Sequence, residues 1–203
     1  MPTFVTLLRG VNVGKAKRVP MEAFRELLSG LGYTKVRTLL NSGNAVFDAA
    51  GGTSARHAKA VATAIAAQLS IEVPVVVKSA RQIAAIVSAN PLADSATDHS
   101  RLLVVFTQDK KELSALERIG PLVAPEEGFA IGEHAAYLYC AGGILESRAG
   151  AALLGAAGRT ATTRNWATTL KLHALANTDV AGPLVPGSRH PGLVPCRRRA
   201  EAS

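Results

Sequence analysis

The chain has 203 residues, of which 48% are hydrophobic and 19% charged, with a formal net charge of +8 at pH 7. This composition excludes a disordered protein and predicts one large or two small globular domains with a sizeable core. No apolar run approaches the length that spans a bilayer. Since the opening Met-Pro-Thr-Phe also lacks the features of a signal peptide, we expect a cytoplasmic protein without membrane contact.

The positive charge is concentrated near the N-terminus, where residues 1–50 carry about half of it. Lysine and arginine side chains that neutralise phosphates release counterions, so nucleic acid is one candidate partner. The alternative is a basic composition without any polyanionic partner.

The first half of the chain alternates short β-branched runs with stretches of helical periodicity. The β-branched runs predict strands. The periodic stretches predict helices, where a capping residue precedes them and a glycine follows. The composition of Asn41-Ser42-Gly43-Asn44 is that of a tight turn between two strands. In chain order we predict a strand at 3–8, a helix at 20–32, strands at 36–40 and 45–47, a helix from 53 or 54 to 69, and a strand at 73–77. The order is βαββαβ.

A helix predicted at 80–88 leads into the second half, where the same order of elements recurs without repetition of sequence. We predict a strand at 102–106, a helix at 110–119, hairpin strands at 129–131 and 136–140, a helix at 147–157, a strand at 160–163 and a final helix at 164–176. Beyond them, Gly, Pro and Ser residues and the run Arg197-Arg198-Arg199 predict a mobile tail.

Two βαββαβ units predict an α+β protein with two antiparallel sheets, each covered on one face by two helices. The open faces then pack either on each other or on a second subunit. We place the first unit and the connecting helix in residues 1–90, the second unit and the C-terminal helix in 91–177, and the tail in 178–203.

The first candidate site follows the first strand, in the stretch LLRGVNVGKAKR. This stretch has one residue fewer between its first glycine and its Gly-Lys than a phosphate-binding P-loop, and Ala16 replaces the hydroxyl that would hold a metal. Strands linked by a crossover helix run parallel, so this loop should lie beside the 41–44 turn. Guanidinium, backbone N–H and amide groups there suit an anionic or amide-like ligand. The candidates are Arg9, Gly10, Asn12, Gly14, Asn41, Ser42, Gly43 and Asn44.

A simpler interpretation of this first site is that Asn41–Asn44 is only a turn and that Arg9 pairs with a nearby acid.

The second candidate site is Thr163-Arg164-Asn165-Trp166, at the predicted start of the final helix. A threonine cap followed by Arg and Asn exposes N–H groups and a partial positive charge, which together attract an anion. Trp166, the single tryptophan, either stacks on a base or ring or anchors the helix to the core.

Together, the segments LLRGVNVGKAKRVPMEAFRELLSGLGYTKVRTLLNSGNAVF and TTRNWATTLKLHAL resemble the signature segments of a widespread bacterial family, family 1697 of the domains of unknown function. The resemblance spans Thr3–Ala176 and places all the candidate residues above in signature positions. It implies two ferredoxin-like units, or alpha-beta plaits, and no established activity. Lys15-Ala16-Lys17 departs from the glycine and polar residues that often follow in the family.

The sequence lacks the usual groups for chemistry. It has no nucleophile elbow, its histidines lack metal-ligand spacing, and its two cysteines, Cys140 and Cys196, are too few for a disulfide framework. Neither signature segment contains a proton carrier, and Ser42 has no local base. Glu133-His134 is the one acid–base pair of note, and the composition of a turn also explains it. We expect no metal and no cofactor.

Three hypotheses follow. The first is a binding module for a small nucleotide- or phosphate-like anion, with Arg9 and Arg164 as its charges. The second is an enzyme for a small phosphorylated or carboxylated substrate, which requires both segments to meet in one pocket. The third is a structural or oligomeric protein whose signature residues are turns, caps and anchors. A small anion ranks above RNA, because Phe4 and Phe47, the nearest sheet aromatics, are expected in the core.

Overall fold

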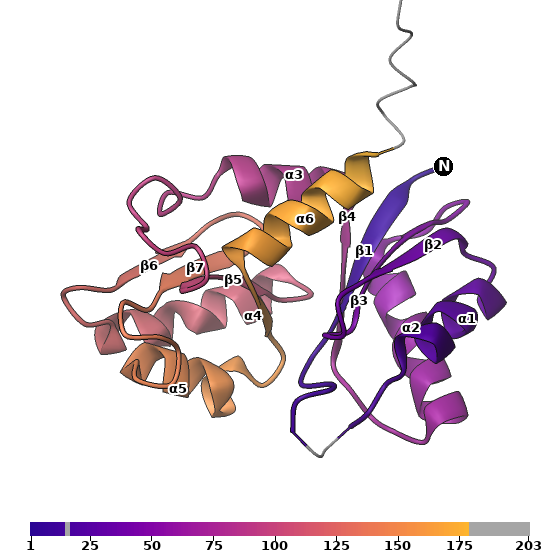
Figure 1. The fold of residues 1–203 in the computed structure, drawn as a ribbon, viewed down its shortest axis with the longest axis horizontal. Helices are drawn as coiled ribbons and strands as arrows, with labels where there is room; N and C mark the ends of the chain where they lie inside the picture. Colours follow the sequence, from indigo (N-terminus) through magenta and orange to yellow (C-terminus); the bar gives the residue numbers. More distant parts are fainter. Residues whose placement is uncertain (15–16, 179–203) are drawn as a thin grey trace, which may run out of the picture.

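The computed structural model describes residues 1–14 and 17–178. Its first unit is a four-stranded antiparallel sheet in the order β2-β3-β1-β4, with α1 and α2 packed on one face (Figure 1). The elements are β1 (Thr3–Leu8), α1 (Met21–Gly30), β2 (Thr34–Leu39), β3 (Asn44–Asp48), α2 (Ser54–Leu69) and β4 (Val75–Ser79). Apolar side chains of both helices, among them Phe24 and Ile65, meet Leu8 and Ala45 of the sheet in one buried cluster.

The second unit repeats this topology, with the strand order β6-β7-β5-β8. Its elements are β5 (Leu102–Phe106), α4 (Lys110–Ser114), the 3-10 helix η1 (Ala115–Leu122), β6 (Gly128–Ile131), β7 (Ala136–Tyr139), α5 (Arg148–Leu154), the 3-10 turn η2 (Ala156–Gly158) and β8 (Thr162–Asn165). The predicted α+β fold of two ferredoxin-like units is therefore confirmed.

The junction between β8 and the final helix differs from the prediction. The helix, α6 (Trp166–Asn177), begins after Arg164, which lies in β8 opposite Val104 of β5. The ladder with β5 continues to Asn165, and Asn165 caps the helix by accepting a hydrogen bond of 2.9 Å from the backbone N–H of Thr168. The predicted helix start at Arg164 with a threonine cap is thus wrong, because strand pairing extends further than local propensity indicates.

Proline and glycine move three other boundaries. The strand predicted at 73–77 is β4, which begins after Pro74, a residue that has no N–H for a ladder. The helix predicted at 110–119 changes from α4 into η1, which contains Pro121. The helix predicted at 147–157 is divided at Gly155 into α5 and η2.

The open faces of the two sheets contribute to one central core, to which α3 (Ala80–Ser88) and α6 also contribute. Val5 of β1 and Phe106 of β5 belong to it, together with Ile83 of α3 and Leu172 of α6. In Figure 1, α3 and α6 run side by side across the top of the two units. The two sheets thus share a core within one chain, as the first of the two predicted packings requires.

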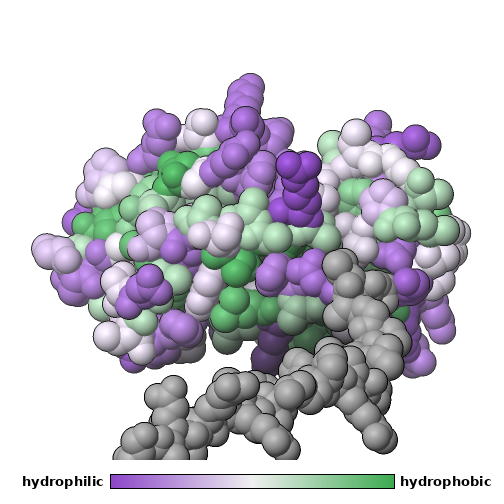
Figure 2. Space-filling view, turned by 90° about the horizontal axis from the view of Figure 1, so that it is seen from above, coloured by the Kyte–Doolittle hydropathy of each residue, from purple (hydrophilic) through white to green (hydrophobic). Residues whose placement is uncertain are grey.

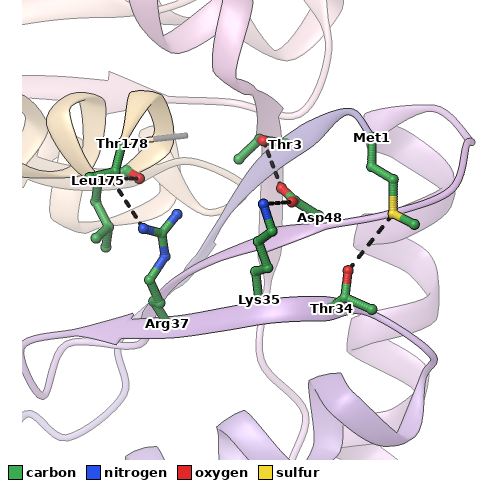
Figure 3. A network of polar contacts seen from close by, with 8 residues as sticks. All are labelled: Met1, Thr3, Thr34, Lys35, Arg37, Asp48, Leu175 and Thr178. Carbon is green, nitrogen blue, oxygen red and sulfur yellow. Dashed lines mark hydrogen bonds and ion pairs between the residues drawn. The ribbon is translucent and has the colours of Figure 1, made fainter. Parts of the chain in front are cut away.

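A polar network at the edge of the first sheet connects β2 to the end of α6 (Figure 3). Arg37 Nη1 donates a hydrogen bond of 3.1 Å to Thr178 Oγ1, which in turn donates to the carbonyl of Leu175. On β3, the buried carboxylate of Asp48 accepts a 2.7 Å hydrogen bond from Thr3 Oγ1 and lies 3.5 Å from Lys35 Nζ. This network ties the final helix to the first unit.

The face that carries α3 and α6 has hydrophobic residues interspersed with hydrophilic ones (Figure 2). Among residues 1–14 and 17–178, no helix is both long and apolar enough to cross a bilayer. Apart from Thr178, the predicted tail at 178–203 lies outside the described residues.

Candidate functional site

Both candidate segments meet in one groove between the two units, with a volume of about 580 Å³. The loop after β1 and the β2–β3 turn form one wall, and β8 with the start of α6 forms the other. Two arginines and no carboxylate line this groove, which makes it electropositive. The candidate residues that line it are Arg9, Gly10, Ser42, Thr163, Arg164 and Asn165.

Arg164 lies at the bottom of the groove, where its residue surface is only 9% exposed. Its guanidinium donates five hydrogen bonds, which is the full capacity of the group. The acceptors are Asn44 Oδ1, Thr162 Oγ1 at 2.8 Å, and the carbonyl oxygens of Leu8 at 2.8 Å, Ser42 at 2.9 Å and Thr163 at 2.7 Å. Three of these acceptors belong to the first unit, so Arg164 joins the two units.

The buried Arg164 carries a charge that none of its hydrogen-bond partners neutralises, since none of them is a carboxylate. Burial lowers its pKa to about 10, which leaves the guanidinium protonated at neutral pH. Because every N–H of Arg164 already has an acceptor, this side chain acts on a ligand in the groove through its charge and not through a hydrogen bond.

Arg9 is the second cation of the groove and is half-buried. Its Nη1 donates to the carbonyl of Ala161, and its Nη2 donates to the carbonyl of Leu154 at 3.0 Å. Burial lowers the pKa of Arg9. The acid partner that the simpler interpretation requires is absent among the described residues, where carbonyl oxygens accept instead. Each terminal nitrogen of Arg9 carries a second N–H, which is the hydrogen-bonding capacity that a ligand would need.

The candidates Asn12, Gly14 and Asn41 line a different pocket, of about 460 Å³, beside the start of α1. Asn12 braces the loop after β1: its Nδ2 donates to the carbonyls of Val19 at 2.9 Å and Asn41 at 2.7 Å, and its Oδ1 accepts from the N–H of Val19. Its φ of 58° is a left-handed conformation that asparagine tolerates well. The amide of Asn12 therefore holds both ends of the loop and the neighbouring turn.

The remaining candidates, Gly43, Asn44 and Trp166, are buried and have structural roles. Gly43 has a φ of +69°, and a Cβ at this position would lie 2.6 Å from the Cβ of Leu8. Asn44, besides accepting from Arg164, donates to the carbonyl of Leu39. Trp166 is 4% exposed in the central core, as the anchor interpretation predicts.

Two further polar residues that line the groove, Ser100 and Thr168, were not predicted from the sequence. Thr168 follows directly from the cap, because a helix that starts after Asn165 places this residue in its first turn. Ser100 lies in the loop before β5, and no local pattern distinguishes it from other loop serines.

The side chains that line the groove provide recognition without general acid–base chemistry. No Asp, Glu, His or Cys is among them. Within the described part of the chain, no group of three or more such residues is arranged to hold a metal ion. Arginine, amide and hydroxyl groups together bind an anionic oxygen and leave proton transfer unassisted.

Comparisons with known proteins support the fold and assign no activity. The model of a family described as "Protein of unknown function (DUF1697)" matches residues 1–137, which include the first signature segment and exclude the second. A structure described as that of the conserved bacterial protein SP0830 from Streptococcus pneumoniae is 22% identical, with a TM-score of 0.73. The alignment covers 86% of this chain and 98% of that one, and therefore shows a shared fold. The curated proteins contain no match.

Proposed function

Since the chain belongs to the DUF1697 family, whose description assigns no function, we propose from the groove itself that this protein is a binding module for a small anion. The ligand carries a phosphate or carboxylate group and occupies the groove between the two units. The observation that carries this proposal is a groove lined by two arginines and no carboxylate.

Arg9 and Arg164 contribute to anion binding in different ways. Arg164 is buried and has no carboxylate among its partners, so its charge is weakly screened in the groove. Arg9 supplies directional N–H groups at the rim, while Ser42, Thr163 and Asn165 offer hydroxyl and amide groups for orientation. A phosphate or carboxylate matches both the charge and this set of donors.

The composition and size of the groove favour binding of a small molecule over the alternatives. The meeting of the two segments satisfies one requirement of the enzyme hypothesis, but the lining offers no proton carrier. A volume of about 580 Å³ is within the usual range of small-ligand sites. RNA is disfavoured because Phe4 and Phe47, the aromatic residues of β1 and β3, are both buried and stack on each other with ring centroids 5.8 Å apart.

The fluorescence of Trp166, the single tryptophan, provides a test of this proposal. Trp166 follows Asn165 of the groove directly, so its fluorescence should report a ligand bound there. We would titrate the full chain with nucleotides, sugar phosphates, dicarboxylates and short single-stranded RNA, at low and at near-physiological salt. The proposal predicts a saturable change with a small anion that survives physiological salt. A response to RNA alone that disappears with salt would indicate non-specific attraction and would overturn it.

A further inference from the structure

A second cavity lies between the two units and shares no lining residue with the groove. It has a volume of about 120 Å³ and is enclosed by the end of β4, the start of α3, the β5–α4 loop and the β6–β7 turn. Glu133 and His134, the acid–base pair of that turn, line it together with Lys78. The cavity thus brings a lysine of the first unit together with proton carriers of the second.

Lys78 is an unusual residue for its position. It is only 4% exposed, on a strand where Val76, two residues earlier on the same face, packs in the central core. Within residues 1–14 and 17–178, its amine makes no hydrogen bond and no ion pair. A buried lysine without such partners carries a desolvation penalty that favours the neutral amine.

The nearby carboxylates are engaged elsewhere. Asp109 Oδ1 accepts a 2.9 Å hydrogen bond from the N–H of Glu112, and Glu112 Oε2 accepts one of 2.9 Å from the N–H of Gln108. Both acids favour the charged form of Lys78 from a distance, but burial is the larger effect and lowers the pKa of its amine. The neutral, nucleophilic form of Lys78 is therefore more accessible than that of an exposed lysine, and Lys78 shares the cavity with Glu133 and His134, which can transfer protons.

We propose that Lys78 forms imines with small neutral aldehydes inside this cavity. The volume of about 120 Å³ equals that of about four water molecules, which fits a carbonyl compound of two or three carbons. The surrounding charges, Asp109, Lys110, Glu112 and Glu133, are mixed in sign and give no preference for an anionic substrate.

The reaction balances without an oxidant or a reductant. The lone pair of the neutral amine attacks the carbonyl carbon, and a proton moves from the nitrogen to the oxygen to give a carbinolamine. The C–O bond then breaks, water leaves with a proton supplied by Glu133 or His134, and the nitrogen keeps a positive charge as the protonated imine.

Reductive trapping tests this proposal on the wild-type chain. We would incubate the protein with limiting glycolaldehyde and cyanoborohydride near neutral pH and locate the modified lysines by peptide mass spectrometry. Lys110 is the internal control, because it lines the same cavity with a side chain that is 80% exposed. We expect Lys78 to be modified severalfold faster than Lys110, because burial lowers the pKa of the Lys78 amine. A rate at Lys78 equal to or below that of Lys110 would overturn the proposal.

Two further experiments distinguish reaction inside the cavity from the general reactivity of exposed lysines. Pyridoxal 5′-phosphate, which is larger than the cavity and anionic, should modify exposed lysines and spare Lys78; equal labelling of Lys78 by this probe would contradict selection by the cavity. The double substitution Glu133→Gln and His134→Asn should slow trapping at Lys78 and leave the rate at an exposed lysine such as Lys59 unchanged. An unchanged rate at Lys78 would remove these two residues from the proposed proton transfer.

Discussion

Arg164 in β8 donates a hydrogen bond to Asn44 Oδ1 at the start of β3, across 120 positions of sequence and between the two units. The two side chains belong to different sheets, and both are buried. A polar link of this kind favours one register of the interface, because the hydrogen bonds of Arg164 to the first unit are lost if the units shift.

Replacing Arg164 with alanine should destabilise the whole protein. The substitution leaves the buried Asn44 Oδ1 and the carbonyl of Leu8 without this donor, and we expect a loss of about 3–5 kcal/mol in the free energy of unfolding. Arg81→Ala, at an exposed arginine on α3, is the matched control and should change it by less than about 0.5 kcal/mol. Urea denaturation measures the free energy of unfolding of both variants. Equal stability of the two variants would show that the Arg164 hydrogen bonds do not hold the units together.

Gly43 should resist substitution more than Gly10. Both have positive φ, at 69° and 62°, so alanine brings a conformational strain of about 1–2 kcal/mol at either position. Only at Gly43 does the new Cβ also collide with neighbours, the side chains of Leu8 and Val11, while at Gly10 it meets open space. We expect Gly43→Ala to lower the unfolding free energy by about 1–3 kcal/mol more than Gly10→Ala. A similar loss for the two variants in thermal denaturation would contradict the packing seen around Gly43.

The substitution Asn12→Asp tests whether the Asn12 side chain stabilises the loop after β1. Aspartate keeps the shape of the side chain but faces the carbonyls of Val19 and Asn41 with an oxygen instead of two N–H donors. We expect a loss of about 1–3 kcal/mol and faster tryptic cleavage after Lys17, which lies within the braced segment. Asn41→Asp, at an exposed side chain of the adjacent turn, changes charge equally and serves as control. Unaltered cleavage in Asn12→Asp would rule out the brace.

His57 should make the protein less stable in acid. The imidazole is buried, with Nδ1 2.9 Å from the hydroxyl of Tyr33, and burial lowers its pKa below the ordinary value of 6.5. Below that value the unfolded chain binds a proton that the folded chain does not, so stability falls as the pH drops from 6.5 through the folded pKa.

Thermal denaturation between neutral pH and pH 5 measures this effect. His57→Phe keeps a ring beside Phe4 and Phe47 and should reduce the loss of stability in acid, whereas His99→Gln, at an exposed histidine, should retain it. If wild type and His57→Phe lose stability in parallel, the buried imidazole is not the source of the acid sensitivity.

The sequence predicted the features that depend on local chemistry. Turn composition predicted the turn between β2 and β3, although its last predicted residue, Asn44, begins β3, and helical periodicity predicted α2 after its Thr53 cap. Two repeats of one element order were then sufficient for the fold class, because short βαββαβ units have few ways to cover a sheet.

Long-range pairing determined what the sequence could not reveal. The length of β8 depends on its pairing with β5, which local propensity does not show, so Arg164 was predicted in a helix. In the structure Arg164 pairs with β5 as part of β8, and its five hydrogen bonds reach acceptors in both units. Long-range contacts also explain why only some of the candidate residues line the groove. Asn12 and Gly43 lie in the same signature segment as Arg9, but Asn12 holds the loop after β1 and Gly43 packs closely against its neighbours. Lys78 follows an apolar run, and nothing in that run indicates that this lysine is buried.

The groove is tested most directly by calorimetric titration of phosphate- and carboxylate-bearing small molecules at physiological salt, with wild type beside Arg9→Gln and Arg18→Gln. Arg9 lines the groove, whereas Arg18 is an exposed arginine of the neighbouring pocket, so the two substitutions remove equal charge at different places. We expect saturable one-to-one binding that Arg9→Gln weakens about tenfold or more, because a charge-assisted hydrogen bond is lost, and that Arg18→Gln leaves unchanged. Binding that is equal in wild type and Arg9→Gln, or absent for every anion tried, would contradict it.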